Sequence, residues 1–216
     1  VDGDLVTIAE IGGGTFDVAA HFVIAAGVAD VAKLKVGQMV LAEWASSLKH
    51  AVVEGFEGPA EKPERVRIRY IDLPESWPDE KVLATRSPRE LTAINEGMSP
   101  GNFALARDEG RDALVMLVAL TPQGWLVQRF GGRVALLPET VLVAIPHAPK
   151  LRKGDKVRMP WVGMMMPGTV TRTRGTWVYA KVEGIGQKDP ISAPIGHVVP
   201  EALAIAGVKA ATEEKP

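Results

Sequence analysis

The chain has 216 residues, of which 46% are hydrophobic and 24% are charged. Its 22 Gly and 16 Pro indicate a folded, turn-rich protein, neither disordered overall nor collagen-like. A formal net charge of -1 gives no overall attraction to polyanions, and the absence of Cys excludes disulfides, thiolate metal sites and Cys nucleophiles.

The first 33 residues are expected to form a β-hairpin that packs on the rest of the chain. Leu5 to Ile11 alternates in polarity and would return as Thr15 to Ala25 around a Gly turn. The phrase Ile11 to Asp17 also resembles the second phosphate loop of the actin and Hsp70 ATPases, which would imply a nucleotide at Gly12 to Gly14. The alternation favours the hairpin.

No stretch is apolar enough to predict a spanning helix, because the richest one, Val18 to Val36, is interrupted by His21, Asp30 and two Lys. The start at Val1, without Met, indicates a processed or trimmed chain. The sequence leaves the cellular location open.

An internal repeat organises the remaining residues. The spacing of Gly37, Val40, Trp44 and Val53 recurs in Gly154, Val157, Trp161 and Val170. A third copy begins at Gly101, with Asp108 in the place of the tryptophan, and the copies close on phrases that start at Pro88, Pro138 and Pro200. The predicted units are 34–95, 96–147 and 148–208, followed by a tail, 209–216.

Within a unit the hydrophobic period is that of strands. Val66, Ile68 and Tyr70 alternate with three arginines, and Gly175 and Gly124 mark hairpin turns. Short helices are expected only within residues 75–83 and 28–34. Each unit is therefore predicted to be a small all-β module of about five strands.

The third copy, residues 151–184, resembles a Tudor-like or SH3-like barrel, whose first strand commonly reads Gly-Asp/Gln-x-Val-x-Ala-x-Trp. The resemblance extends over the first two thirds of the first copy, and the second copy shares only the spacing. The expected fold class is all-β, with three tandem SH3/Tudor-like small barrels and an N-terminal β-hairpin.

In the Tudor family an aromatic cage holds methylated Lys or Arg by cation–π attraction. The resemblance places Trp161 at the first ring and Met166 near the second, and it places the first copy's rings at Trp44, Tyr70 and Trp77. Two protein-binding or peptide-binding grooves are predicted, one around Trp44, Tyr70 and Trp77 and the other around Trp161, Met165 and Trp177. The run of three Met at 164–166 suits either an adaptable contact surface or a filler between packed units.

The alternative is a nucleic-acid module. Its basic stripes would be Arg65, Arg67 and Arg69 on one strand and Arg172 and Arg174 on a hairpin. An alternating charged face is also the ordinary way to solvate a half-buried sheet.

No catalytic or metal-binding phrase is recognised. The four His have no paired ligand spacing, and no Ser lies in a Gly-x-Ser-x-Gly setting. The expectation is a non-catalytic interaction protein with no cofactor, a protein or peptide partner and an oligomeric state that the sequence leaves open.

Overall fold

The structure is a computed structural model. It describes residues 5–9, 14–20, 23, 29–30, 33–45, 47–59, 63–108 and 110–204. Gly12, Gly13, His21 and the predicted tail lie outside the described residues, so the phosphate-loop hypothesis is not tested at its Gly run.

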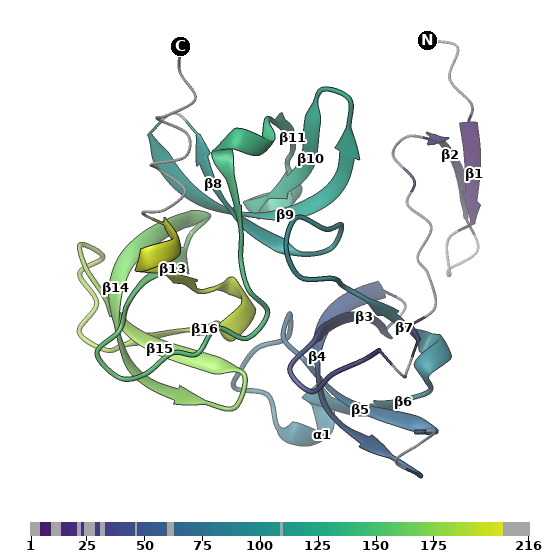
Figure 1. The fold of residues 1–216 in the computed structure, drawn as a ribbon, viewed down its shortest axis with the longest axis horizontal. Coiled ribbons are helices and arrows are strands. Elements are labelled where there is room, and N and C mark those ends of the chain that lie inside the picture. Colours follow the sequence, from purple (N-terminus) through teal and green to yellow (C-terminus); the bar gives the residue numbers. More distant parts are fainter. Residues whose placement is uncertain are drawn as a thin grey trace.

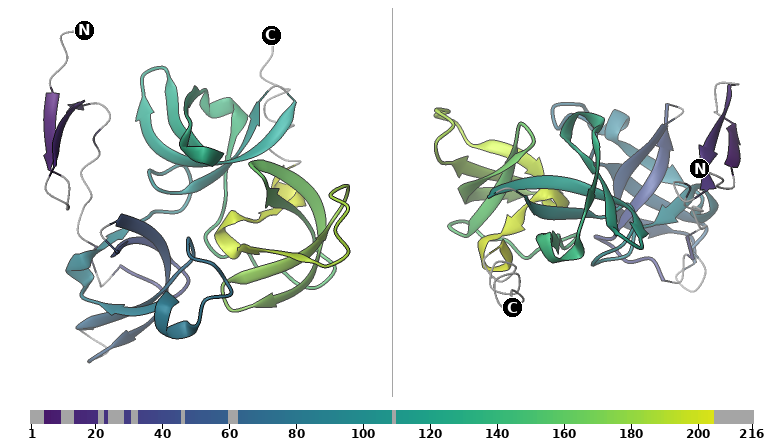
Figure 2. Two further views of the ribbon diagram at one scale, coloured as in Figure 1. Left: turned by 180° about the vertical axis from the view of Figure 1, so that it is seen from behind. Right: turned by 90° about the horizontal axis from the view of Figure 1, so that it is seen from above.

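Strands β1 (Leu5–Ala9) and β2 (Thr15–Ala19) pair antiparallel, as the hairpin interpretation predicts. Figures 1 and 2 show this hairpin beside the three large sheets rather than against them. Its predicted packing on the units stays a prediction. Farther along the same segment, Ala29 is buried in the core of the first unit, where its N–H donates to the carbonyl of Leu91.

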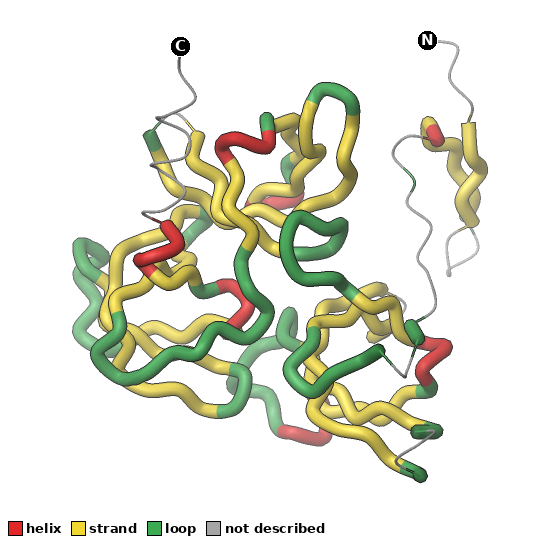
Figure 3. Tube along the Cα trace, viewed as in Figure 1, coloured by secondary structure: helices red, strands yellow, loops and turns green. Residues whose placement is uncertain are grey.

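Three five-stranded antiparallel sheets follow in tandem, and each defines a unit (Figures 1 and 3). The first unit contains β3 (Met39–Trp44), β4 (Ser47–Glu57), β5 (Arg65–Tyr70), β6 (Leu83–Arg86) and β7 (Leu91–Ala93). The second contains β8 (Phe103–Asp108), β9 (Arg111–Thr121), β10 (Gly124–Arg129), β11 (Val134–Leu137) and β12 (Leu142–Ala144). The third contains β13 (Lys156–Trp161), β14 (Met164–Arg174), β15 (Trp177–Val182), β16 (Ile191–Pro194) and β17 (Val199–Pro200).

The helical elements are short. Helix α1 (Asp79–Val82) lies inside the predicted range 75–83. Single 3-10 turns, η2 (Pro88–Glu90), η4 (Glu139–Val141) and η5 (Ile195–His197), precede the last strands, and η3 (Phe130–Gly132) precedes β11. Among the described residues no helix is long and apolar enough to cross a membrane.

The repeat predicted from Gly and Trp spacing is confirmed in the backbone. Gly37, Gly101 and Gly154 all have positive φ, at 87°, 84° and 96°, and each lies just before the first strand of its unit. Their N–H groups donate to the carbonyls of Val53, Leu117 and Val170, at 2.8, 2.7 and 2.8 Å. A register shift follows each of these three residues, and such a bulge bends the long second strand of the unit.

Two expectations need correction. No sheet closes into a barrel, because the last strand pairs with the first and the fourth strand remains an edge, as in the order β6-β5-β4-β3-β7. The Pro phrases do not begin the closing strands. Pro88 begins the 3-10 turn ahead of β7, Pro138 is the N-cap of the 3-10 turn ahead of β12, and Pro200 ends β17. In the third unit the proline that precedes the turn is Pro194.

Each unit has its own buried core, and a further core is shared by all three. The first strands explain it: Val40 and Ala42 point into the first unit, whereas Met39 joins the shared core from the opposite face of β3. Figure 2 shows the three sheets around this common centre. The buried residues of the shared core are Met39, Val52, Ile71 and Ile94 from the first unit, Phe103, Leu105 and Ile145 from the second, and Met165, Val199 and Ala204 from the third.

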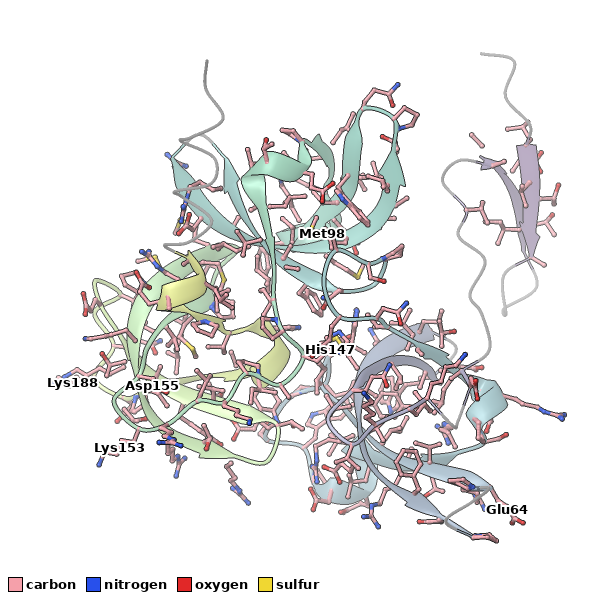
Figure 4. All side chains as sticks on the ribbon, in the orientation of Figure 1. Glu64, Met98, His147, Lys153, Asp155 and Lys188 are labelled. Atoms are coloured by element: carbon pink, nitrogen blue, oxygen red, sulfur yellow. The ribbon has the colours of Figure 1, made fainter. Side chains whose placement is uncertain are left out.

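Buried histidines tie the units together around that core. The His147 side chain, placed between the units in Figure 4, accepts a hydrogen bond from the Met39 N–H through Nδ1 (3.2 Å). His50 contacts the Asp72 carboxylate through Nδ1 and the Gly101 carbonyl through Nε2, both at 2.9 Å. The His50 ring therefore contacts the Asp72 loop of the first unit through one nitrogen and the start of the second unit through the other.

His197 lies beside Phe103 in the same region, with ring centroids 4.1 Å apart. Part of residue 197 reaches the surface, but its Nε2 atom is enclosed and has no hydrogen-bond partner among the described residues. Burial lowers the pKa of His197 to about 4, against an ordinary value of 6.5. Burial alone would raise the pKa of Asp72, but hydrogen bonds from His50 outweigh it and the pKa is lowered.

We predict that Gly101→Ala costs more stability than Gly154→Ala. Both substitutions place a side chain at positive φ, which costs about 1 kcal/mol of unfolding free energy. At Gly101 the new Cβ would also lie 3.2 Å from buried Ile94, whereas nothing lies within 4 Å at Gly154, so the first loss should reach about 2 kcal/mol. Urea unfolding measures the unfolding free energy of both variants. Equal losses of stability would contradict the prediction, because they would show that Ile94 moves aside from the new Cβ without destabilising the protein.

Acidification should destabilise the junction of the units. Between pH 6.5 and pH 4 the unfolded chain binds a proton at His197 that the folded chain does not bind. The free energy of unfolding should therefore fall by about 3 kcal/mol over this range. The lowered pKa of His147 acts in the same direction. Asp72 contributes only when the pH falls below 3.8, the ordinary pKa of an Asp carboxyl. Urea unfolding at the two pH values should show that His197→Gln removes most of the pH-dependent loss. An unchanged loss in this variant would contradict the assignment.

Candidate functional site

A cleft of about 510 Å³ lies between the first and third units, and five of the eleven predicted site residues line it: Arg69, Tyr70, Trp77, Arg174 and Trp177. The first unit contributes the end of β5, the following loop and α1, and the third unit contributes the β14–β15 hairpin. Figures 1 and 3 show the segment with α1 beside the third unit. Its lining residues are Glu54, Arg69, Tyr70, Leu73, Pro74, Glu75, Trp77, Pro78, Asp79, Val82, Arg174, Gly175, Thr176 and Trp177.

The local sequence explains both walls. Pro74 and Pro78 bracket a turn in which the Trp77 N–H donates to the Pro74 carbonyl (3.0 Å), and α1 starts directly after it. On the other wall Gly175 has a φ of 55°, which permits the tight hairpin between β14 and β15. The two prolines and the hairpin hold Trp77 and Trp177 on opposite walls of one cleft.

The aromatic residues of the first predicted groove lie together. Trp44 and Trp77 are half-buried and their rings pack at a centroid distance of 5.7 Å. Tyr70 is buried, and its hydroxyl donates to the Glu43 carbonyl. Of these three side chains, Tyr70 and Trp77 line the cleft, and Trp44 supports Trp77 without lining it.

The charges of the cleft are largely paired on its first-unit wall. Arg69 donates to Glu54 (2.6 Å) and Asp79 (2.9 Å). The hydrogen bond and the positive charge of Arg69 lower the pKa of Asp79, with a smaller contribution from Arg174 across the cleft. Glu75 also lines the cleft and has no hydrogen bond or ion pair to another described residue. Three carboxylates and two guanidinium groups therefore give the lining a small negative excess.

One polar atom of the lining lacks a partner. The Thr176 hydroxyl is buried, and no described residue hydrogen-bonds to it. Such a group costs free energy unless something else satisfies it. A ligand or water that entered the cleft beside Thr176 would reduce that cost.

The second predicted groove does not form as one site. Trp161 pairs with Met164 at one end of β14, whereas Trp177 pairs with Arg174 at the other, so the eleven residues of β14 separate the two rings. Met165 is only 3% exposed and packs in the shared core. Its role is that of the filler between units, the second of the two interpretations of the Met run.

The basic stripes are split by their surroundings. Arg65 and Arg67 are exposed on β5, but Arg69 on the same strand is held by two carboxylates. Arg172 is exposed and stacks over the Tyr179 ring, 4.0 Å from its centroid. Arg174 lines the cleft.

A second hollow, of about 860 Å³, lies between the first and second units. It is lined partly by Leu41, Ile94 and Met116, and it contains none of the predicted aromatic or arginine site residues. Among the described residues no group of three His, Asp or Glu is placed to hold a metal ion.

Sequence reasoning missed Glu54, Glu75, Asp79 and Thr176. Only Glu75 and Asp79 lie within the short helix predicted over residues 75–83, and carboxylates near a helix start are typical of any helix. Glu54 and Thr176 belong to one site only because the first and third units, which the second unit separates in the sequence, lie side by side in the structure. Comparison with protein-family models and with curated proteins finds no match for this chain.

Proposed function

We propose that the protein is a non-catalytic binding protein whose cleft between the first and third units receives a basic side chain of a protein or peptide partner. The observation that carries the proposal is the pairing of two half-exposed indoles, Trp77 and Trp177, on opposite walls of a cleft that also holds Glu75 and Asp79. Aromatic faces and carboxylates together attract Lys and Arg side chains.

The units themselves support an SH3/Tudor-like interpretation in the broad sense. Each has a long bulged second strand, a 3-10 turn before the last strand, and a last strand that pairs with the first. We therefore propose that each unit is an open form of the small barrel, in which no hydrogen bonds join the two edge strands of the sheet. Trp177 begins β15 and Trp77 lies in the loop between β5 and α1, so both rings are presented by connections between the elements of these modules.

Nucleic acid is the weaker candidate. A phosphate would compete with Glu54 and Asp79 for Arg69, and the remaining basic residues do not form one continuous stripe. Binding through Arg65, Arg67 and Arg174 would weaken steeply with salt, with a log–log slope near -0.9 for each phosphate contacted on duplex DNA.

The proposal predicts that a peptide array will select Lys-containing or Arg-containing sequences. For the best peptide, measured by fluorescence anisotropy, Trp177→Ala should raise Kd about thirtyfold, or about 2 kcal/mol, as for a buried aromatic hot spot. Glu75→Gln should also weaken binding, and replacement of the basic residue of the peptide by Ala should abolish it.

Trp161→Ala is the matched control. It removes another half-buried tryptophan of the same unit, at the end of β13, which pairs with the end of β14 that lies away from the cleft, so it should leave the peptide Kd unchanged. Selection of acidic or purely apolar peptides, or an equal loss with Trp161→Ala, would overturn the proposal. Tight binding of a duplex DNA probe that depends on Arg65 and Arg67 would favour the nucleic-acid alternative.

A further inference from the structure

The outer edge of the second sheet is apolar and open. Strand β11 is the end strand of its sheet, and the side chains of Val134 and Leu136 are 60% and 48% exposed. The next strand, β10, places half-buried Leu126 directly beside Leu136. Figure 1 shows β10 and β11 on the side of the second unit that faces away from the other two.

The backbone of β11 presents hydrogen-bonding groups to that edge. The Arg129 N–H donates to the Arg133 carbonyl (2.7 Å), and the pairing of β10 with β11 continues without a register shift up to Leu137. In an antiparallel pair the residues alternate between bonding inward and bonding outward. The N–H and C=O groups of Val134 and Leu136 therefore point away from β10.

The repeat identifies the same edge positions in the other units. Ile68, Val127 and Ala180 are equivalent because they pair with the residues that precede the three bulges. Their partners on the fourth strands are Ala84, Ala135 and Ile191. The residues equivalent to Val134 are thus Leu83 and Pro190, and those equivalent to Leu136 are Thr85 and Ser192.

Among the described residues, only those of the second unit leave this edge position without a partner or a proline. The Leu83 N–H is bonded to the Asp79 carbonyl at the end of α1. Pro190 has no N–H to donate, and Pro194 ends the same strand. Helices over an edge, prolines and polar residues are the devices that keep sheet edges from pairing with other chains. The second unit has none of them on β11.

We propose that β11 is the contact through which two copies of this chain pair, antiparallel, about a two-fold axis at Ala135. In this arrangement Val134 lies opposite Leu136 of the partner subunit, and the reciprocal pair is generated by the symmetry. The outward N–H and C=O groups of both residues then form four hydrogen bonds. The exposed apolar side chains meet on one face.

Charge favours a second copy in this orientation. Arg133 precedes the strand and Glu139 follows it, so antiparallel pairing brings the basic end of one copy to the acidic end of the other. Parallel pairing would bring like charges together. Because the strand has only four residues, the contact is smaller than a standard interface of about 1,600 Å², and the dimer should depend on concentration.

Sedimentation velocity over concentrations from about 1 μM to about 500 μM tests the proposal. The wild-type chain should pass from monomer to dimer within that range. The double variant Val134→Lys and Leu136→Lys should remain monomeric, or dimerise at least tenfold more weakly. Far-UV circular dichroism and urea unfolding would confirm that the variant is folded.

The control is Ser192→Lys, which places a charge at the equivalent edge position of the third unit. It should dimerise like the wild type. A wild-type chain that stays monomeric throughout, or a control that loses dimerisation as fully as the double variant, would overturn the proposal. Because β11 does not line the cleft, peptide binding can fail or succeed independently of this result.

Discussion

The structure depends on one apolar centre that all three units bury together in addition to their own cores. A module of about fifty to sixty residues is near the lower limit for an independent core. Strands β3 and β8 are apolar on both faces, so an isolated unit would leave Met39 or Phe103 in water. In β13 the outward residue is Arg158, which binds Glu201 and also lies 3.7 Å from Asp112 of the second unit. The three sheets therefore form one folded body.

Much of the fold followed from local chemistry that the sequence displays directly. Gly37 and Gly154 signalled the same backbone turn, and the alternation around Ile68 signalled a sheet with one buried face. The sequence comparison aligned Pro200 of the third unit with Pro138 of the second, because a Glu follows each of them, and this alignment was wrong. The true counterpart of Pro138 is Pro194, and only the pairing of the strands reveals this. Barrel closure, likewise, depends on contacts between distant edges.

The candidate site was predicted in pieces. Tyr70 and Trp77 came from one segment, and the structure places both on one wall. Trp177 was assigned to a different groove, because the sequence contains no signal that the first and third units share a boundary. Met165 was expected at a surface, but the alternation along β14 turns it toward the shared core. Which face of a strand is buried depends on how the units pack against one another. That packing involves residues far apart in the sequence, so no local sequence pattern predicts it.

The shared core has a consequence for how the chain reaches its native state during synthesis. Domains generally fold as they emerge from the ribosome, N-terminal first. Here Met39 and Val52 emerge early, but Met165 and Val199, which help to cover them, are made more than a hundred residues later. The first unit must therefore wait with an apolar face uncovered until the third is complete. Slow translation between the units would prolong that exposure. A chaperone that shields apolar surface would act in the interval between synthesis of the first unit and completion of the third.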